Sequence, residues 1–385
     1  MRPPSEPLAD LLSEEIASHG PMTFRDFMEL ALYHPELGYY RSGRARIGRG
    51  GDFITSVSVG PLFGKLLARQ FVEMWERLEK PPSFTIVEQG ADRGEFACDA
   101  LAALAALAPE CFAATTYRIV EPAPRSEAAQ RERLTPFRDR VQWHASLETL
   151  SPITGLFFSN ELLDAFPVHR VKWIGAEWIE QRVTERDGAF CFVDAPIGEG
   201  ELREHLQKLP VLPDGYETEV NLEALRWVAA IAGRLERGYV LALDYGFSRD
   251  EMYRPERAGG TLSAYAAHRR EPDPLARPGE IDITAHVDFT SLAERAEVRG
   301  LPLIGWTDQH HLMVGLSRLH FRDQLAPDAA AQRELRAFQT LMHPGFLGQS
   351  FTALCLGKNV SAAPPLAGFT FASDARRALG LPESA

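Results

Sequence analysis

Acidic side chains stand directly after two short apolar runs of this sequence. Phe84-Thr85-Ile86-Val87 leads into Glu88-Gln89-Gly90-Ala91-Asp92-Arg93-Gly94, and Glu121-Pro122 follows the next run. Glycines at such a turn let the backbone approach a ligand closely, and a carboxylate at a strand end can bind an ammonium group or both hydroxyls of a ribose. The pattern favours an adenosyl ligand, although carboxylates that only cap helices would look the same.

The same turn lacks the features of a phosphate site. Its glycine spacing is not the G-x-G-x-x-G dinucleotide fingerprint, and no Gly-Lys-Ser or Gly-Lys-Thr occurs in the chain. A ligand with a pyrophosphate group is therefore disfavoured.

A second group of polar residues follows another apolar run. Ser159-Asn160-Glu161-Leu162-Leu163-Asp164 places Asn160, Glu161 and Asp164 where the carboxyl edge of a parallel sheet would lie. Ligands of open α/β sheets bind at that edge. Two carboxylates and an amide could hold a cationic nitrogen against a methyl donor, which is catalysis by proximity. The alternative is that Asn160 and Asp164 cap the next helix.

Three further sites are candidates for chemistry. His286 could act as a general base, or it could brace its loop by a hydrogen bond. Thr55 and Ser56 end a glycine-rich stretch, residues 47–56. Gly48 to Gly51 with Arg46 and Arg49 could form a phosphate-binding nest, or the stretch could be a flexible hinge that covers a ligand. The pair His310-His311 has no third ligand at suitable spacing, so we expect a structural role and no metal.

Hydropathy patterns predict the elements that position these residues. Strands are predicted at 84–87, 117–120, 155–159 and 239–243, with a helix at 95–107 between the first two. Such βαβ units belong to a doubly wound parallel sheet. Further predictions are helices within 5–33, 63–78, 217–235 and 330–341, antiparallel strands within 170–195, strands at 311–316 and 351–356, and an aperiodic lid loop at 246–284.

These elements suggest four segments along the chain. They are an N-terminal helical module with the glycine-rich loop, a cofactor-binding half of the main domain, an insertion, and the remainder of the main domain with its lid. Their predicted bounds are 1–80, 81–169, 170–236 and 237–385.

Composition limits the partners. The 385 residues carry a net charge of −12, which disfavours nucleic acid or an anionic membrane and favours a cationic peptide or a neutral metabolite. The four cysteines are widely spaced, and we expect reduced, mostly buried thiols. The N-terminus has no signal-peptide pattern, and no run is long enough to span a bilayer. We expect a cytoplasmic protein, and a homo-oligomer is possible.

Across most of its length the chain resembles the mitochondrial complex I assembly methyltransferase family and its bacterial members. The segments that carry the resemblance are Leu32-Tyr33-His34-Pro35, Gly38-Tyr39-Tyr40, Gly51-Asp52-Phe53-Ile54-Thr55-Ser56, Ser159-Asn160-Glu161-Leu162-Leu163-Asp164-Ala165, Asp244-Tyr245-Gly246, Gly260-Thr261-Leu262 with Tyr265 and His268, and Asp282-Ile283-Thr284-Ala285-His286-Val287-Asp288-Phe289. The chain departs from the family where Ala91-Asp92 replaces Pro-Gly and where Val57-Ser58 replaces Pro-Glu.

The resemblance implies a seven-stranded, Rossmann-like class I methyltransferase fold and the cofactor S-adenosyl-L-methionine. Its mitochondrial branch implies symmetric dimethylation of a protein arginine. The cofactor contacts that we expect are Thr55, Ser56, Glu88, Gly90, Ala91, Asp92, Gly94, Glu121, Pro122 and Asn160. The residues that we expect to act on the acceptor are Asn160, Glu161, Asp164 and His286.

We therefore predict methyl transfer from S-adenosyl-L-methionine to a nitrogen, with protein arginine as the first candidate acceptor. One alternative is a noncatalytic assembly or binding protein that keeps the fold. Others are a small-molecule methyltransferase and a nucleotide-dependent oxidoreductase, and the missing dinucleotide fingerprint counts against the last.

Overall fold

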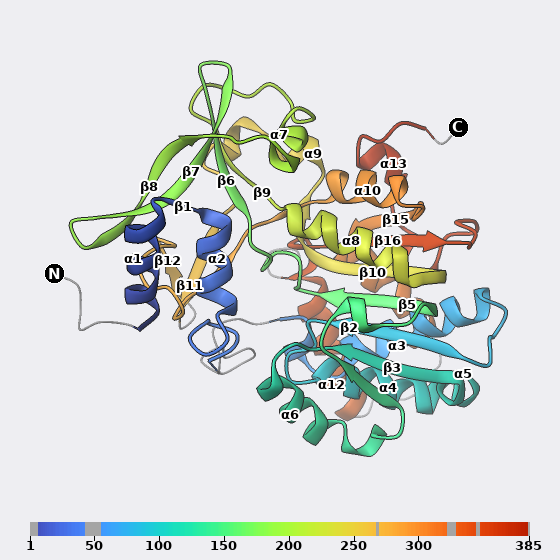
Figure 1. Ribbon diagram of the computed structural model, residues 1–385. Helices are drawn as coiled ribbons and strands as arrows, with labels where there is room; N and C mark the ends of the chain where they lie inside the picture. Colours follow the sequence, from blue (N-terminus) through green and yellow to red (C-terminus); the bar gives the residue numbers. More distant parts are fainter. Residues whose placement is uncertain (1–6, 43–54, 267–268, 322–328, 344–346, 384–385) are drawn as a thin grey trace. The chain divides into compact units, whose positions relative to one another are not determined.

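The computed structural model describes residues 7–42, 55–266, 269–321, 329–343 and 347–383 (Figure 1). The chain divides into two compact units, and each is built from three separate stretches of sequence. The first unit contains Met1–Phe53, Leu163–Arg226 and Arg249–Asp288, and the second contains Ile54–Leu162, Trp227–Ser248 and Phe289–Ala385.

The second unit is built on a sheet in which seven strands follow the order β15-β16-β10-β5-β2-β3-β4. Their bounds are β2 Phe84–Gln89, β3 Thr115–Val120, β4 Val141–His144, β5 Ile153–Asn160, β10 Leu235–Phe247, β15 Leu303–Asp308 and β16 Phe351–Lys358. Strand β16 runs antiparallel to β10 and β15, and the other pairs are parallel. This is the doubly wound arrangement predicted from the sequence.

Helices cover both faces of this sheet. They are α3 Leu62–Arg77, α4 Glu95–Leu107, α5 Pro109–Ala114, α6 Pro124–Arg133, α8 Leu222–Arg234, α10 Phe289–Val298, α11 Gln309–His320, α12 Ala329–Met342 and α13 Ala375–Ala378. Side chains alternate along a strand, so neighbouring residues face opposite layers. Ile86 packs in the core formed with α3 and α4, whereas Gln89 accepts a hydrogen bond of 3.1 Å from Trp227 of α8.

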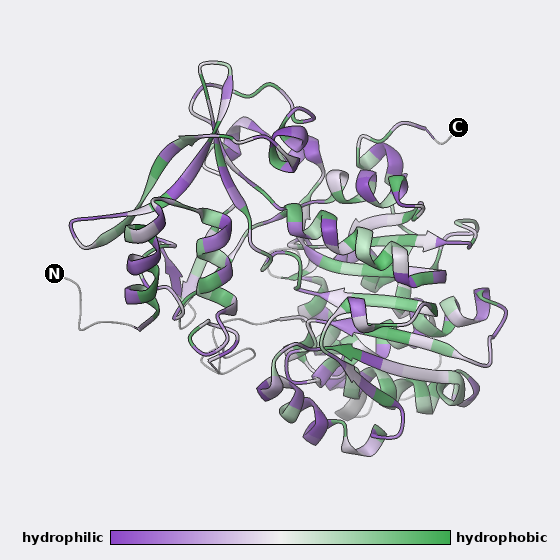
Figure 2. Ribbon diagram, viewed as in Figure 1, coloured by the Kyte–Doolittle hydropathy of each residue, from purple (hydrophilic) through white to green (hydrophobic). Residues whose placement is uncertain are grey.

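The apolar pattern of the strands explains why they occupy the centre. Residues of β5 and β10 are buried along most of their length, and Figure 2 shows hydrophobic residues along these strands. A row of rings joins the helices to the sheet: Phe96 stacks on Phe158 at 4.3 Å between ring centroids, and Phe71 meets Phe158 edge-on at 5.6 Å. The predicted helix at 63–78 is thus confirmed as a core element.

The first unit combines helices with two small antiparallel sheets. Its helices are α1 Pro7–His19, α2 Phe24–Tyr33, α7 Glu201–Leu206 and α9 Arg249–Met252. Strands β1 Met22–Thr23, β6 His169–Ile174, β7 Glu177–Arg186, β8 Ala189–Pro196 and β9 Glu217–Val220 form the larger sheet. Phe24 and Phe27 of α2 pack on Phe192 and Phe190 of β8, with ring centroids 5.5 and 5.7 Å apart.

Two sequence predictions in this region were incomplete. Residues 246–284 are not one aperiodic lid, because strands β11 Ser263–Ala266, β12 Arg269–Glu271 and β13 Asp282–Thr284 form a small sheet there. The segment predicted as one helix at 217–235 begins with strand β9 before α8. These strands have three or four residues, which is too short for their sequences to show a clear alternation.

The strand predicted at 311–316 is wrong. These residues lie in helix α11, and the strand comes before it, at Leu303–Asp308. The side chain of Asp308 caps the helix by accepting a hydrogen bond of 2.8 Å from the amide of His311. Leu312, Met313 and Leu316 are buried at helical spacing, which a run of six residues does not distinguish from a strand.

No helix in the described part of the chain combines the length and the apolar character needed to cross a membrane.

Candidate functional site

The carboxyl ends of three neighbouring parallel strands meet at one edge of the large sheet. Gln89 of β2 lies beside Ser159 of β5, and Asn160 lies beside Leu243 of β10. The residues that follow these strands, among them Gly90 and Glu161, therefore gather at one edge. The sheet thus places Gly90, Asn160 and Glu161, three of the residues that the sequence suggested for ligand binding, at this edge.

The turn after β2 is a left-handed loop that leads into α4. Gly90 has φ +83°, Asp92 +44° and Gly94 +78°. The amide of Gly94 donates a hydrogen bond of 2.7 Å to the carbonyl of Ala91, which closes the turn. Glycine adopts such angles without strain, whereas Asp92 occupies a conformation that costs most residues free energy. The Asp92 side chain is exposed to solvent, and Ala91 is buried.

Glu88 is a buried residue of β2, just before this turn. Its carboxylate accepts a hydrogen bond of 2.7 Å from the hydroxyl group of Tyr117, and only 3% of the residue is exposed. Burial raises the pKa of Glu88 from 4.5 to about 7, although the Tyr117 hydrogen bond opposes this shift. Glu88 is therefore poised to lose its proton when a cation approaches.

Glu121 is held by two hydrogen bonds at the end of β3. One carboxylate oxygen accepts from the amide of Ala123 at 2.8 Å, and the other accepts from Gln130 Nε2 at 2.9 Å. Pro122, between Glu121 and Ala123, is exposed. The carboxylate thus keeps one orientation.

Gln130 is a polar residue of this site that the sequence reasoning missed. It is fully buried on α6, and its Nε2 also donates to the carbonyl of Asp92 at 2.9 Å. Helix α6 reads PRSEAAQRER and has no apolar stripe that would have marked Gln130 as an inward-facing residue. The only sequence feature that connected Gln130 with this site was its position nine residues after Glu121.

Asn160 and Glu161 form a linked pair at the end of β5. Asn160 Nδ2 donates to the Glu161 carboxylate at 2.9 Å, and Glu161 has φ +53°. In the described part of the chain, the buried Oδ1 of Asn160 meets no hydrogen-bond donor. A buried polar atom without a partner is unusual in folded proteins and marks a place where a ligand can contribute one.

Asp244 braces the same edge from β10. It is fully buried, and its carboxylate accepts hydrogen bonds from the amides of Leu162 at 3.0 Å and Tyr245 at 2.9 Å. Its motif was part of the family resemblance, but no role was predicted for it. The structure shows that Asp244 shapes the loop after Asn160.

Thr55 and Ser56 are buried in contacts with the protein. Ser56 Oγ donates to Gln309 Oε1 at 2.8 Å, and Thr55 Oγ1 accepts from the amide of Ser58 at 3.2 Å. Both hydroxyl groups thus have structural partners, and their role in cofactor binding stays a prediction. Most of the glycine-rich stretch, residues 47–54, lies outside the described residues.

Asp164 and His286 belong to the first unit, whereas Asn160 and Glu161 belong to the second. The carbonyl of Asp164 accepts a hydrogen bond of 2.9 Å from Ala285, which precedes His286. Burial lowers the pKa of His286 from 6.5 to about 4, so its imidazole is neutral near pH 7. Its backbone amide donates to Thr261 Oγ1 at 3.0 Å, which braces the loop.

Aromatic and acidic residues lie near Asp164 within the first unit. The rings of Tyr33 and Tyr40 stack with centroids 5.5 Å apart, and the Tyr40 hydroxyl donates to Asp282 at 2.6 Å. The Tyr33 hydroxyl donates to the carbonyl of Ala165 at 2.9 Å. Asp164 and Asp282 are both at most 5% exposed. Carboxylates and ring faces are the groups that attract cations in proteins.

His310 and His311 lie in the first turn of helix α11. The Nδ1 atom of His310 lies 3.0 Å from the carbonyl oxygen of Met342, and that of His311 lies 2.7 Å from the Asp308 carboxylate. Among the described residues, no group of three or more His, Cys, Asp or Glu side chains could hold a metal ion. Both histidines therefore have structural partners at the helix end.

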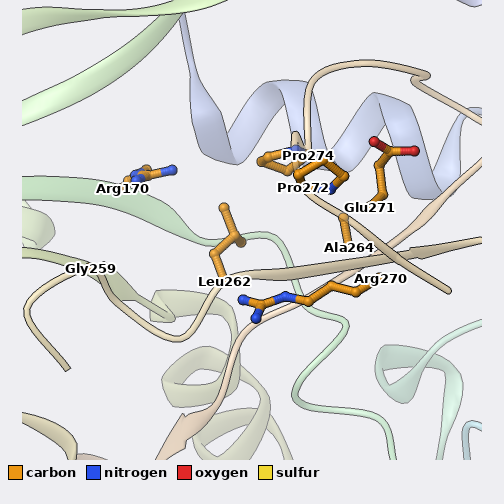
Figure 3. A pocket seen from close by; sticks show the side chains of 8 residues that line it. All are labelled: Arg170, Gly259, Leu262, Ala264, Arg270, Glu271, Pro272 and Pro274. Carbon is orange, nitrogen blue, oxygen red and sulfur yellow. The ribbon is translucent and has the colours of Figure 1, made fainter. Parts of the chain in front are cut away.

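The first unit also contains a cavity of about 410 Å³ (Figure 3). Its lining combines two arginines, Arg170 and Arg270, with Leu262 and two prolines. Arg170 is paired with Glu217 at 2.7 Å. None of the residues predicted for the site lines this cavity.

The sheet order and the glycine turn define a class I methyltransferase-like protein, and comparisons with known proteins identify its family. Residues 66–307 match the family model of S-adenosyl-L-methionine-dependent methyltransferases, and the chain belongs to this family. The resemblance, the fold class and the predicted cofactor type are thereby confirmed.

Relatives cover nearly the whole chain. It is 30% identical to the mitochondrial protein arginine methyltransferase NDUFAF7 homolog of Drosophila melanogaster, over 94% of this chain and 88% of that protein. The human protein arginine methyltransferase NDUFAF7 is 26% identical over 92% and 84%. A Burkholderia thailandensis protein, crystallised with S-adenosyl-homocysteine, is 31% identical with a TM-score of 0.86, and the match covers 98% of this chain and all of that one.

Proposed function

We propose that this protein transfers a methyl group from S-adenosyl-L-methionine to a nitrogen atom of a protein arginine. The single observation that carries the cofactor part is the edge formed by the left-handed glycine turn, the fixed carboxylate of Glu121 and the buried Oδ1 of Asn160. The names of the Drosophila and human relatives support arginine as the acceptor.

The residues at this edge fit an adenosyl ligand. We assign the ribose hydroxyls to Glu121, the close backbone approach to Gly90 and Gly94, and the ammonium group to Glu88. When bound, S-adenosyl-L-methionine supplies a methyl group activated by its sulfonium centre. The protein's own task is then to align the nucleophile and to remove water and a proton.

In this reaction the methyl group passes directly from the sulfonium sulfur to a nitrogen of the acceptor. A guanidinium group is planar and cationic, so carboxylates can hold it and present one of its nitrogens to the methyl group, and that nitrogen must lose one proton as the new N–C bond forms. We assign this role to Glu161, which Asn160 holds. The Glu161 carboxylate can also accept the proton that the nitrogen releases. For Asp164 and His286, which belong to the first unit, a role toward the acceptor stays a prediction from the sequence. The acidic net charge of −12 suits a basic protein acceptor.

Titration of the purified protein with S-adenosyl-L-methionine and S-adenosyl-homocysteine tests the cofactor assignment. We expect saturable binding of both. A folded sample that binds neither would overturn the proposed function. NADH serves as the control ligand, because a dinucleotide would bind only if the oxidoreductase alternative were correct.

Mass spectrometry of acceptor proteins and peptides after incubation with labelled cofactor tests the acceptor. We expect label on arginine and none on lysine in otherwise identical peptides. Glu161→Gln, which keeps an acceptor for Asn160 Nδ2 but loses the charge, should lower turnover about 10- to 100-fold. Label found only in low-mass compounds would support a small-molecule acceptor. Binding without any transfer would support the noncatalytic assembly protein.

A further inference from the structure

We propose that Gln130 is a positioning residue that couples the glycine turn to the carboxylate of Glu121, so that both parts of the cofactor site depend on one buried amide. The inference rests on the proposed function, because it assigns the cofactor's ribose to Glu121.

The orientation of the Gln130 amide follows from its partners. Trp143 Nε1 donates a hydrogen bond of 2.9 Å to Gln130 Oε1, and an indole N–H group can only donate. The amide oxygen must therefore face Trp143. Its NH₂ group then faces the carbonyl of Asp92 and the carboxylate of Glu121, each at 2.9 Å. The amide oxygen and the NH₂ group of Gln130 thus link three parts of the protein: Trp143 on β4, the glycine turn and Glu121.

Packing places the glycine turn directly on this residue. A Cβ atom added to Gly94 would lie 3.5 Å from Gln130 Cγ and 3.6 Å from its Cα. The turn after β2 thus touches α6 where Gln130 projects inward. Movement of α6 would shift both the Asp92 carbonyl and the Glu121 carboxylate.

The positively charged side chain of Arg131 contacts Trp143, the residue that donates to Gln130. The guanidinium group of Arg131 lies 4.1 Å from the centroid of the Trp143 ring, and Arg131 also pairs with Glu127 at 2.7 Å. Trp143 is therefore held on its face as well as at its nitrogen. These two contacts fix the orientation of the indole ring and therefore the direction of its hydrogen bond to Gln130.

Glutamine is the residue that this position requires. A glutamate would put a second carboxylate against Glu121 and an acceptor against the Asp92 carbonyl. A methionine would fill a similar volume but would leave the Trp143 N–H group and the Asp92 carbonyl without partners. These two substitutions test charge and hydrogen bonding separately.

Calorimetric titration with S-adenosyl-homocysteine tests the proposal. Gln130→Met should bind about ten-fold more weakly than the wild type, which corresponds to the loss of hydrogen bonds to a charged group. Val141→Ala is the matched control, because it makes a cavity in the core at the start of β4, away from the carboxyl edge. It should lower stability while changing affinity less than about three-fold. Equal loss of affinity in both variants would overturn a positioning role.

Two further measurements test whether the loss of affinity arises from the contact between Gln130 and Glu121. Compared with the wild type at the same pH, Gln130→Glu should regain affinity as the pH falls, because the introduced carboxylate and that of Glu121 can then share one proton. A loss relative to the wild type that does not depend on pH would contradict the proposal. In a double-mutant cycle, Gln130→Met should cost little when Glu121 is already alanine, and full additivity would overturn the coupling. A wild-type protein that binds no S-adenosyl-homocysteine would instead overturn the proposed function itself.

Discussion

The hydroxyl group of Tyr117 donates a hydrogen bond of 2.7 Å to the carboxylate of Glu88 on the neighbouring strand, and both side chains are enclosed in the second unit. An enclosed carboxylate is stable in its protonated form unless a cation compensates its charge. Glu88 therefore links the stability of the sheet to pH and to the charge of a bound ligand.

Replacement of Glu88 by glutamine should stabilise the protein at high pH. The pKa of Glu88 rises from 4.5 to about 7 on folding, so the folded state holds the proton more tightly and loses stability as the pH rises from 4.5 to 7. Glu88→Gln removes this loss and can still accept the Tyr117 hydrogen bond. Urea unfolding should show equal stability near pH 4.5 and a gain of about 3 kcal/mol at pH 8. A gain that is the same at both pH values would refute this explanation.

Binding of S-adenosyl-L-methionine should release a proton near pH 6.5. The cofactor's ammonium group, if placed at Glu88, lowers the pKa of that carboxyl and drives its ionisation. Calorimetric titrations in buffers of different ionisation enthalpy measure the release. Glu88→Gln should bind without releasing this proton. If the binding enthalpy of the wild type does not depend on the buffer, the assignment of the ammonium group to Glu88 is wrong.

Removal of the Glu121 carboxylate should weaken the cofactor without unfolding the protein. Glu121→Ala loses the proposed acceptor of two ribose hydroxyls, and we expect affinity to fall about 10- to 100-fold. Glu132→Ala, an exposed glutamate on α6, is the matched control and should bind as the wild type does. Unchanged affinity in Glu121→Ala would disprove the assignment of the ribose.

His286 should destabilise the protein in acid. Its pKa falls from 6.5 in the unfolded chain to about 4 in the folded one, mainly because burial disfavours the charged ring. The unfolded state therefore binds the proton first, and stability is lost as the pH falls from 6.5 toward 4. His286→Gln should unfold at a higher urea concentration than the wild type at pH 5, relative to their difference at pH 8. A constant difference across this range would show that the folded protein binds a proton at His286 as readily as the unfolded chain does.

Much of the candidate cofactor edge could be predicted because its determinants are local. The apolar run before Glu88 and the glycines at 90 and 94 define a strand and a turn within about ten residues of sequence. The helix at 309–320 shows the limit of such reasoning. Its apolar run is short, and the Asp308 cap that distinguishes it from a strand was not recognised.

Longer-range contacts were beyond the sequence pattern. Nothing in the charged helix α6 indicates that Gln130 faces Trp143, because the two residues belong to different elements. The hydroxyl of Ser56 donates to Gln309, which lies 253 residues further along the chain, and no local pattern predicts this contact.

The sequence by itself determined the mostly parallel sheet, the edge where the candidate ligand residues gather, and the family, because strand hydropathy and motif order are properties of consecutive residues. Only the tertiary structure decided how Glu88, Glu121 and His286 are ionised or oriented. These properties depend on burial and on partners such as Tyr117 and Gln130, and burial is produced by packing between segments that are distant in the chain.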